Sequence, residues 1–220
     1  MKAKCEPISF IYFDLGSVLL PLDKQRTSDL LCRVSGLDRG DLYSIMVHDN
    51  PDAHFNKAFW GIVLAFDKGK IYPHEFYSRV SKQLRLRVDF DEFVKIWQSM
   101  LGVDRCLLAA IIELRKRGIR TGIISDLCLI HYNRFRELGL CDFFEISFFS
   151  FLEERLKRED DGITFAKAIA AAGLPPRNIL FTDDRAINIL AAERHGLRTH
   201  LYTNSVRFLR YLRRHGIKLN

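Results

Sequence analysis

The chain has 220 residues, of which 48% are hydrophobic, and this length and composition fit one folded domain or a core with an insert. No apolar run approaches the roughly 20 residues that a membrane helix needs, and no cleavable apolar region follows MKAKCEPISF, so we expect a soluble cytoplasmic protein without a membrane partner. The five cysteines lack metal-ligand spacing, and their odd number is typical of free thiols in a reducing compartment.

The formal charge of +7 raises the question whether nucleic acid is a partner. Part of this charge lies in the C-terminal sequence RFLRYLRRHGIKLN, where arginines recur at helical spacing beside Phe208, Leu209 and Leu212. That pattern favours an amphipathic helix with a solvated basic face over a polyanion site. We therefore expect no nucleic-acid partner, although basic charge would attract a small anionic substrate.

The first predicted element is a buried strand at residues 8–13, and residues 21–103 contain helical patterns without a convincing strand. Asp89 predicts the start of one helix, and Phe76, Val80 and Leu84 mark the apolar stripe of another. The helix after Asp89 has its own apolar stripe: Phe93, Ile96, Trp97, Met100 and Leu101. We therefore expect residues 21–103 to form a helical insert, with these aromatic side chains in its core.

The remaining residues alternate between strand and helix patterns. Short apolar runs predict strands at residues 121–124, 144–149, 179–181 and 199–202. Asp104 can cap a helix that ends at Gly118, and another helix runs from Phe165 to Ala172 and ends at Gly173. This alternation predicts an α/β fold, a doubly wound, Rossmann-like parallel sheet formed by residues 1–20 and 104–220.

Polar residues follow several of these strands at the carboxyl end, where α/β sheets bind ligands. They are Asp14 after the first strand, Ser125 and Asp126 after the second, and Asp183 with Asp184 after the fourth. Clustered carboxylates need a compensating cation, and hard oxygen ligands suit Mg²⁺. Simpler readings stay open, because Asp14 could merely bond to the following turn and one acid of the pair could cap a helix.

These segments resemble motifs of the haloacid dehalogenase-like (HAD) family over nearly the whole chain. FDLGSVL is similar to its first motif, IISD to its second and LFTDDRAIN to its fourth. The resemblance implies that Asp14 is a nucleophile, that Ser125 binds phosphate and that Asp183 and Asp184 bind metal with support from Asn188. The segment FDKGKIYPHEFY resembles the small helical cap of bacterial sugar-phosphate phosphatases, an α-glucose-1-phosphate phosphatase among them.

The third motif of the family, a lysine, departs from the usual pattern here. Counting back six residues from Phe165 gives Glu159, whereas Lys157 lies seven residues after Ser150, the spacing that the family has from the third strand. We therefore infer a two-residue insertion and take Lys157 as the cation that neutralises nucleophile and phosphate. The alternative is that Lys157 is one charge in the solvated run EERLKREDD.

Gly16 is a second departure, because most phosphatases of the family have an acid–base aspartate there. Glycine keeps only the backbone carbonyl, which the resemblance implies as a metal ligand. Some helical-capped relatives also have glycine at this position, so the change weakens catalysis without excluding it. Dehalogenases of the family usually have tyrosine there and use no metal, which disfavours that activity for this chain.

The resemblance implies a Mg²⁺-dependent phosphatase acting on a small phosphorylated metabolite through an aspartyl phosphate on Asp14. Ser125, Lys157 and the backbone N–H groups after Asp14, that of Ser17 included, would bind the transferring oxygens. Asp126 is a further candidate for substrate binding. The alternative function is a catalytically impaired protein that binds a phosphorylated ligand or a protein partner.

His131 lies six residues after Ser125, where relatives with the same cap often have histidine. It could contact the substrate or supply a proton, although a lone histidine at a helix start is more often structural. Cys128 in the same loop has no identified base and is interpreted as a packing residue.

Overall fold

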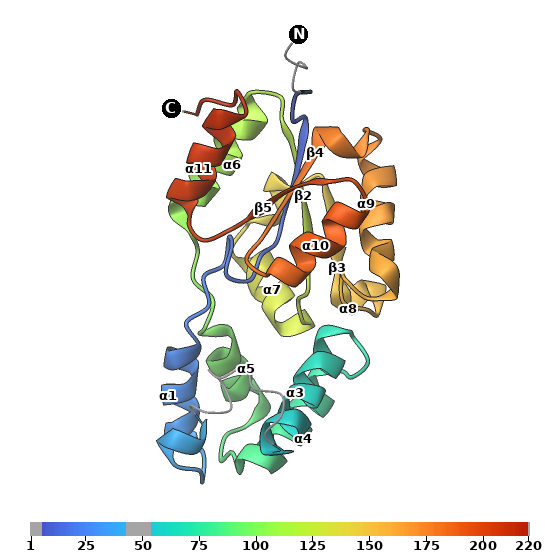
Figure 1. Cartoon of the computed structure of the whole chain (residues 1–220). Helices are drawn as coiled ribbons and strands as arrows, with labels where there is room; N and C mark the ends of the chain where they lie inside the picture. Colours follow the sequence, from blue (N-terminus) through green and yellow to red (C-terminus); the bar gives the residue numbers. More distant parts are fainter. Residues whose placement is uncertain (1–5, 43–53, 220) are drawn as a thin grey trace.

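The structure, a computed structural model, describes residues 6–42 and 54–219 and contains a five-stranded parallel sheet of order β3-β2-β1-β4-β5 (Figure 1). The strands are β1 (Phe10–Phe13), β2 (Arg120–Ser125), β3 (Ile146–Phe149), β4 (Ile179–Asp183) and β5 (Arg198–Leu201). The central strand β1 pairs with both β2 and β4, so the carboxyl ends of these strands lie side by side.

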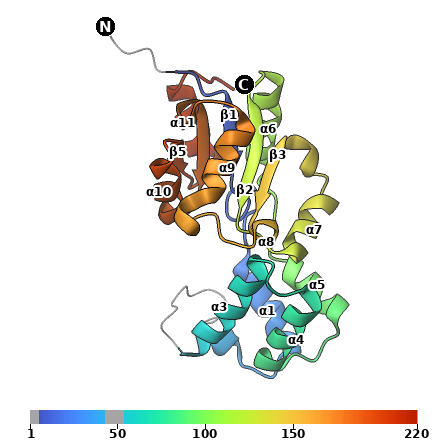
Figure 2. The same ribbon diagram turned by 90° about the vertical axis from the view of Figure 1, so that its right-hand side faces the viewer.

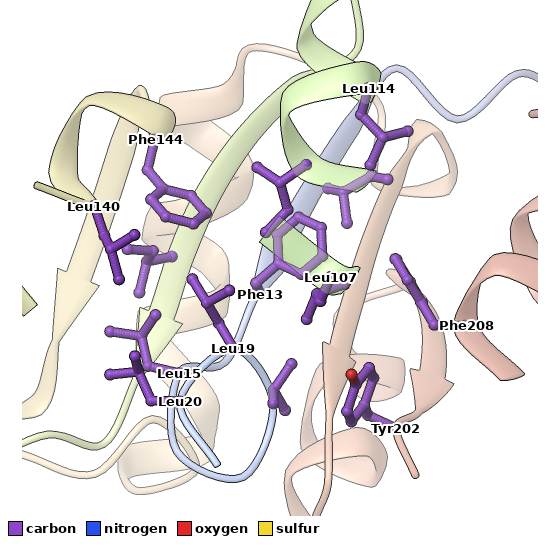
Figure 3. Close-up of a cluster of buried hydrophobic side chains, with 14 of the residues drawn as sticks. Phe13, Leu15, Leu19, Leu20, Leu107, Leu114, Leu140, Phe144, Tyr202 and Phe208 are labelled. Carbon is purple, nitrogen blue, oxygen red and sulfur yellow. The ribbon is translucent and has the colours of Figure 1, made fainter. Parts of the chain in front are cut away.

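Helices cover both faces of the sheet, as the strand and helix patterns predict. Helices α6 (Arg105–Lys116), α7 (Leu129–Glu137) and α11 (Ser205–Arg214) contribute to one apolar cluster, and α9 (Ile163–Ala172) and α10 (Ala186–Arg194) to another. In Figure 3, Phe13 of β1 lies among Leu107 of α6, Phe208 of α11 and Leu19. The fold is therefore a doubly wound, Rossmann-like α/β sheet.

A helical segment lies beyond the carboxyl edge of the sheet, at the opposite end of the molecule from residues 6 and 219 (Figures 1 and 2). It comprises α1 (Lys24–Val34), α3 (His54–Asp67), α4 (Pro73–Leu84) and α5 (Phe90–Gln98). Its helices enclose a third apolar cluster, in which the rings of Phe66 and Phe76 stack with centroids 4.2 Å apart. The aromatic residues expected in the core of the insert, Phe76, Phe93 and Trp97, are buried there.

Local signals set several helix ends as the sequence predicts. The carboxylates of Asp89 and Asp104 accept hydrogen bonds from the backbone N–H groups of Glu92 and Leu107, three residues further on. Gly173 ends α9 in the left-handed conformation. The C-terminal amphipathic helix is α11, which buries its apolar side against the sheet.

Two strands are shorter than predicted. Strand β1 begins at Phe10 rather than Ile8, and β3 begins at Ile146 because the N–H of Phe144 bonds to the carbonyl of Cys141 in a preceding 3₁₀ turn. Four cysteines are free thiols, whereas Cys5 lies outside the described residues. Within the described part of the chain, no helix has both the length and the apolar character required to cross a membrane.

Candidate active site

The polar centre of the molecule is a buried lysine between two aspartates at the carboxyl edge of the sheet. The Lys157 ammonium lies 2.7 Å from Asp14 Oδ1 and 2.7 Å from Asp183 Oδ2. Only 2% of the Lys157 side chain is exposed, so the reading of this lysine as one charge in a solvated run is wrong. Strands β1 and β4 are neighbours, which places the two carboxylates on either side of the same cation.

The segment that carries Lys157 turns sharply on both sides of it. Glu154, Asp160 and Asp161 all have positive φ, so the segment between α8 (Ser150–Glu153) and α9 contains left-handed backbone positions on both sides of Lys157. The backbone N–H of Lys157 donates to Asp126 Oδ1 at 2.8 Å, which fixes the segment to the loop after β2. This geometry places Lys157, rather than Glu159, beside Asp14 and Asp183 at the sheet edge.

Burial and charge together tune the ionisation of this centre. Burial raises the pKa of Asp14 to about 7, and Asp183 and Asp184 add to the shift while Lys157 opposes it. Burial acts to lower the pKa of Lys157, but Asp14 and Asp183 hold the pKa of its ammonium above the usual range. The single buried ammonium therefore leaves negative charge at this edge uncompensated.

Three aspartates whose negative charge exceeds the positive charge of the one lysine form a potential metal site. Carboxylate oxygens of Asp14, Asp183 and Asp184 all lie within 4.8 Å of one another. Asn188 donates to both oxygens of Asp183 at 3.0 Å, while its own Oδ1 is buried without a hydrogen-bond partner among the described residues. Gly16 lines the adjoining cavity. Closely spaced hard oxygens with excess negative charge fit a divalent cation such as Mg²⁺.

Ser125 is the last residue of β2 and is 1% exposed. Its hydroxyl accepts the backbone N–H of Leu15 at 3.4 Å, and the N–H of Ser17 donates to the carbonyl of Leu20 at 2.9 Å. Two N–H groups expected to bind phosphate oxygens are thus bonded within the protein. Ser17 itself has a positive φ and lines the cavity.

A cavity of about 290 Å³ lies between this edge of the sheet and the helical segment. Polar residues from the sheet side line its floor, and apolar residues line much of the wall formed by the helical segment: Leu22, Phe59, Trp60, Val63, Phe66, Trp97, Met100 and Leu101. The space is therefore suited to a small ligand with an anionic end and a less polar organic part.

His131 lines the same cavity, but its ring is already engaged. Its Nε2 lies 3.2 Å from the carbonyl oxygen of Trp97, and burial lowers the pKa of His131 to about 4. The ring is therefore neutral at physiological pH and donates through Nε2, which argues against a role as proton donor to a substrate. Cys128 is buried and burial raises the pKa of its thiol, in keeping with its interpretation as a packing residue.

The sequence analysis missed three charged residues of the cavity lining: Lys24, Asp67 and Arg185. Arg185 directly follows Asp183 and Asp184 in LFTDDRAIN, so the sequence could have predicted that it lies near the acidic pair. Asp67 lies in FDKGKIYPHEFY, a segment singled out only for its likeness to a cap. No sequence signal indicated that the end of this helix meets the sheet edge.

No family model matches the chain. A HAD family enzyme from Bacteroides thetaiotaomicron, solved with magnesium and inorganic phosphate, has a TM-score of 0.72 at 22% identity, over 89% of this chain and 94% of that one. A predicted HAD-like family hydrolase from Porphyromonas gingivalis has a TM-score of 0.75 at 22% sequence identity. The match covers 95% of this chain and 98% of that one. An L-2-haloacid dehalogenase from Xanthobacter autotrophicus has a TM-score of 0.57 at 14% sequence identity. The match covers 96% of this chain and 85% of that one. The chain therefore has the fold of HAD family enzymes.

Proposed function

We propose that this chain, which has the fold of HAD family enzymes, is a Mg²⁺-dependent hydrolase of small phosphate monoesters that works through an aspartyl phosphate on Asp14. The observation that carries the proposal is the contact of Lys157 with both Asp14 and Asp183, beside three carboxylates close enough to share a cation. Such a centre compensates a transferring phosphoryl group, and its ammonium favours the ionised form of the nucleophile.

The metal would be held by Asp14, Asp184 and the carbonyl of Gly16. Asp183 already accepts hydrogen bonds from Lys157, Asn188 and the N–H of Arg185, so it supports the site rather than offering a free oxygen. A bound Mg²⁺ would supply positive charge against the nucleophile and the phosphate oxygens.

The residues of the chain account for the bond changes. Asp14 attacks phosphorus while the bond from phosphorus to the leaving oxygen breaks, and its electron pair stays on that oxygen. The Lys157 ammonium, fixed by Asp126 through the backbone, compensates charge on the transferring group. Water then attacks the aspartyl phosphate, which releases inorganic phosphate and restores Asp14.

One observation favours a protein that binds a phosphorylated ligand without turning it over. Gly16 carries no side chain where an acid would protonate the leaving oxygen, and the N–H groups of Leu15 and Ser17 are bonded internally. Against this reading, the buried contact of Lys157 with Asp14 places a cation beside the nucleophile, which ligand binding alone does not require.

The deciding experiment is phosphate release from a panel of aryl, acyl, alkyl and sugar phosphates, with Mg²⁺ and with EDTA. Sugar phosphates belong in it because residues 66–77 resemble the cap of sugar-phosphate phosphatases. We expect Mg²⁺-dependent turnover that Asp14→Asn abolishes. Binding of inorganic phosphate without turnover of any ester would favour the noncatalytic function.

A further inference from the structure

Asp67 is the last residue of α3 and lines the cavity from the side of the helical segment. Its carboxyl group lies close enough to Asp126 to raise the pKa of Asp67, and Asp126 lines the same cavity from the loop after β2. Asp67 and Asp14 therefore line the same cavity, Asp67 from the helical segment and Asp14 from the end of β1.

The turn that carries Asp67 is fixed to the sheet side of the molecule. The carbonyl of Asp67 accepts a hydrogen bond from Ser150 Oγ at 2.5 Å, and the same hydroxyl accepts the N–H of Leu127 at 2.9 Å. Gly69 packs so closely that a Cβ atom on it would lie 2.2 Å from the carbonyl oxygen of Phe151. Two ion pairs flank the turn, Lys68 with Glu159 and Lys70 with Glu154.

The carboxyl of Asp67 has no hydrogen bond or ion pair with any described residue, and burial followed by the charge of Asp126 raises its pKa to about 7. Asp67 interacts electrostatically with Asp126 and Cys128. The other charged or titratable groups that line the same cavity are Asp14, Lys24, His131, Lys157, Asp184 and Arg185. Asp67 thus holds a proton over the range in which an ordinary aspartate has lost it.

The other acidic groups of the cavity have different tasks. Asp14 is the nucleophile, and Asp184 belongs to the metal set. Asp126 accepts the N–H of Lys157 and pairs with Arg158 at 3.6 Å. The ring of His131 donates to the carbonyl of Trp97. Gly16 offers no side chain, so among the described residues that line the cavity Asp67 is the carboxyl group without another task.

We propose that Asp67 is the acid–base residue of this site, supplied by the helical segment in place of a side chain at position 16; the proposal rests on the proposed function. As the bond between phosphorus and the leaving oxygen breaks, that oxygen takes the proton of the Asp67 carboxyl. The resulting carboxylate then accepts a proton from the water that attacks the aspartyl phosphate. Each turnover returns Asp67 to its protonated form.

The test compares kcat/KM over a series of phosphate esters whose leaving groups differ in pKa. Loss of an acid slows the reaction most when the leaving oxygen is strongly basic. Asp67→Asn should therefore lower kcat/KM for alkyl phosphates by about 10²-fold or more. Esters of acidic phenols should change far less, which makes the dependence on leaving-group pKa steeper. Adding Gly16→Asp to Asp67→Asn should restore part of the alkyl activity.

Lys68→Gln is the matched control, because it removes an ion pair of the same turn and leaves the Asp67 carboxyl in place. Lys68→Gln should lower kcat/KM by the same factor for all esters, without making its dependence on the leaving-group pKa steeper. If Asp67→Asn lowers kcat/KM equally for aryl and alkyl esters while the parent shows Asp14-dependent turnover, the role assigned to Asp67 is overturned and the proposed function stands. Absence of Asp14-dependent turnover on every ester overturns the proposed function, and this assignment with it.

Discussion

At the scale of single residues, Lys157 shows how one cation holds two buried carboxylates together. If it is replaced by methionine, Asp14 and Asp183 stay buried without their counter-charge, which typically costs about 3 to 5 kcal/mol. We expect Lys157→Met to lower the free energy of unfolding in urea by that amount at neutral pH in EDTA. Lys167→Met removes an exposed pair with Glu153 and should cost no more than about 1 kcal/mol. Equal effects of the two variants would contradict this account of the centre.

Asp67 predicts a stability effect that does not depend on catalysis. Its folded-state pKa is raised from 3.8 to about 7, so the folded state binds its proton more tightly than the unfolded chain does. Stability therefore falls as the pH rises between these two values, and the full penalty applies above the higher one. Asp67→Asn should be more stable than the parent by about 1 to 3 kcal/mol at high pH, and the two should converge in acid. Urea unfolding in EDTA at several pH values measures the difference, and a constant difference at every pH would disprove the shift.

Gly16 has room for a side chain, so the effect of a carboxylic acid at this position can be tested by substitution. A Cβ atom on Gly16 would meet only Leu22 Cδ1, at 3.7 Å, an ordinary van der Waals contact. Gly16→Asp should therefore fold normally and raise kcat/KM for alkyl phosphates by about tenfold or more, with a smaller gain for aryl phosphates. Gly16→Ala is the control, because it adds the same Cβ without a carboxyl. An equal gain in both variants would point to an effect of packing rather than proton transfer.

At the scale of secondary structure elements, what the sequence predicts depends on how local the cause is. The caps at Asp89 and Asp104 were predictable because each bonds to an N–H three residues away. The inward position of Lys157 needed a family spacing and an inferred insertion, since the turns around it have no strong sequence signal. Asp67 was missed because its position depends on contacts between α3 and residues more than 80 positions further along the chain.

Gly69 tests whether the turn after α3 really depends on close contact with the sheet side. Its φ is +66°, and a Cβ would collide with the backbone of Phe151, so Gly69→Ala must displace the turn. Gly118 has a φ of +77° with nothing within 4 Å, so Gly118→Ala reports the backbone strain alone. We expect Gly69→Ala to destabilise the protein more than Gly118→Ala and to raise KM for phosphate esters. Equal destabilisation with an unchanged KM would show that the turn does not shape the cavity.

At the scale of the whole molecule, two bodies with separate apolar clusters meet around the cavity. Two antiparallel connections join them, with bonds from Asp23 N–H to the carbonyl of Met100 and from Gly102 N–H to that of Pro21. The turn at residues 67–70 forms a second contact between them. Ligands that bind in the cavity touch both bodies and should therefore stabilise them as a unit.

Magnesium provides the sharpest test at this scale, because its effect on stability does not require turnover. Asp14, Asp183 and Asp184 repel one another in the folded protein, and burial with this repulsion raises the pKa of Asp14 and Asp184. A cation bound only by the folded state relieves that repulsion and stabilises it by about 2.7 kcal/mol when its concentration is a hundredfold above Kd. The Tm should therefore rise with Mg²⁺, and rise further when inorganic phosphate is added. Asp184→Asn removes one ligand charge and should weaken the response to Mg²⁺ without lowering stability in EDTA, because it also removes a source of repulsion. The same Tm increase in Asp184→Asn as in the parent would place the ion elsewhere on the molecule.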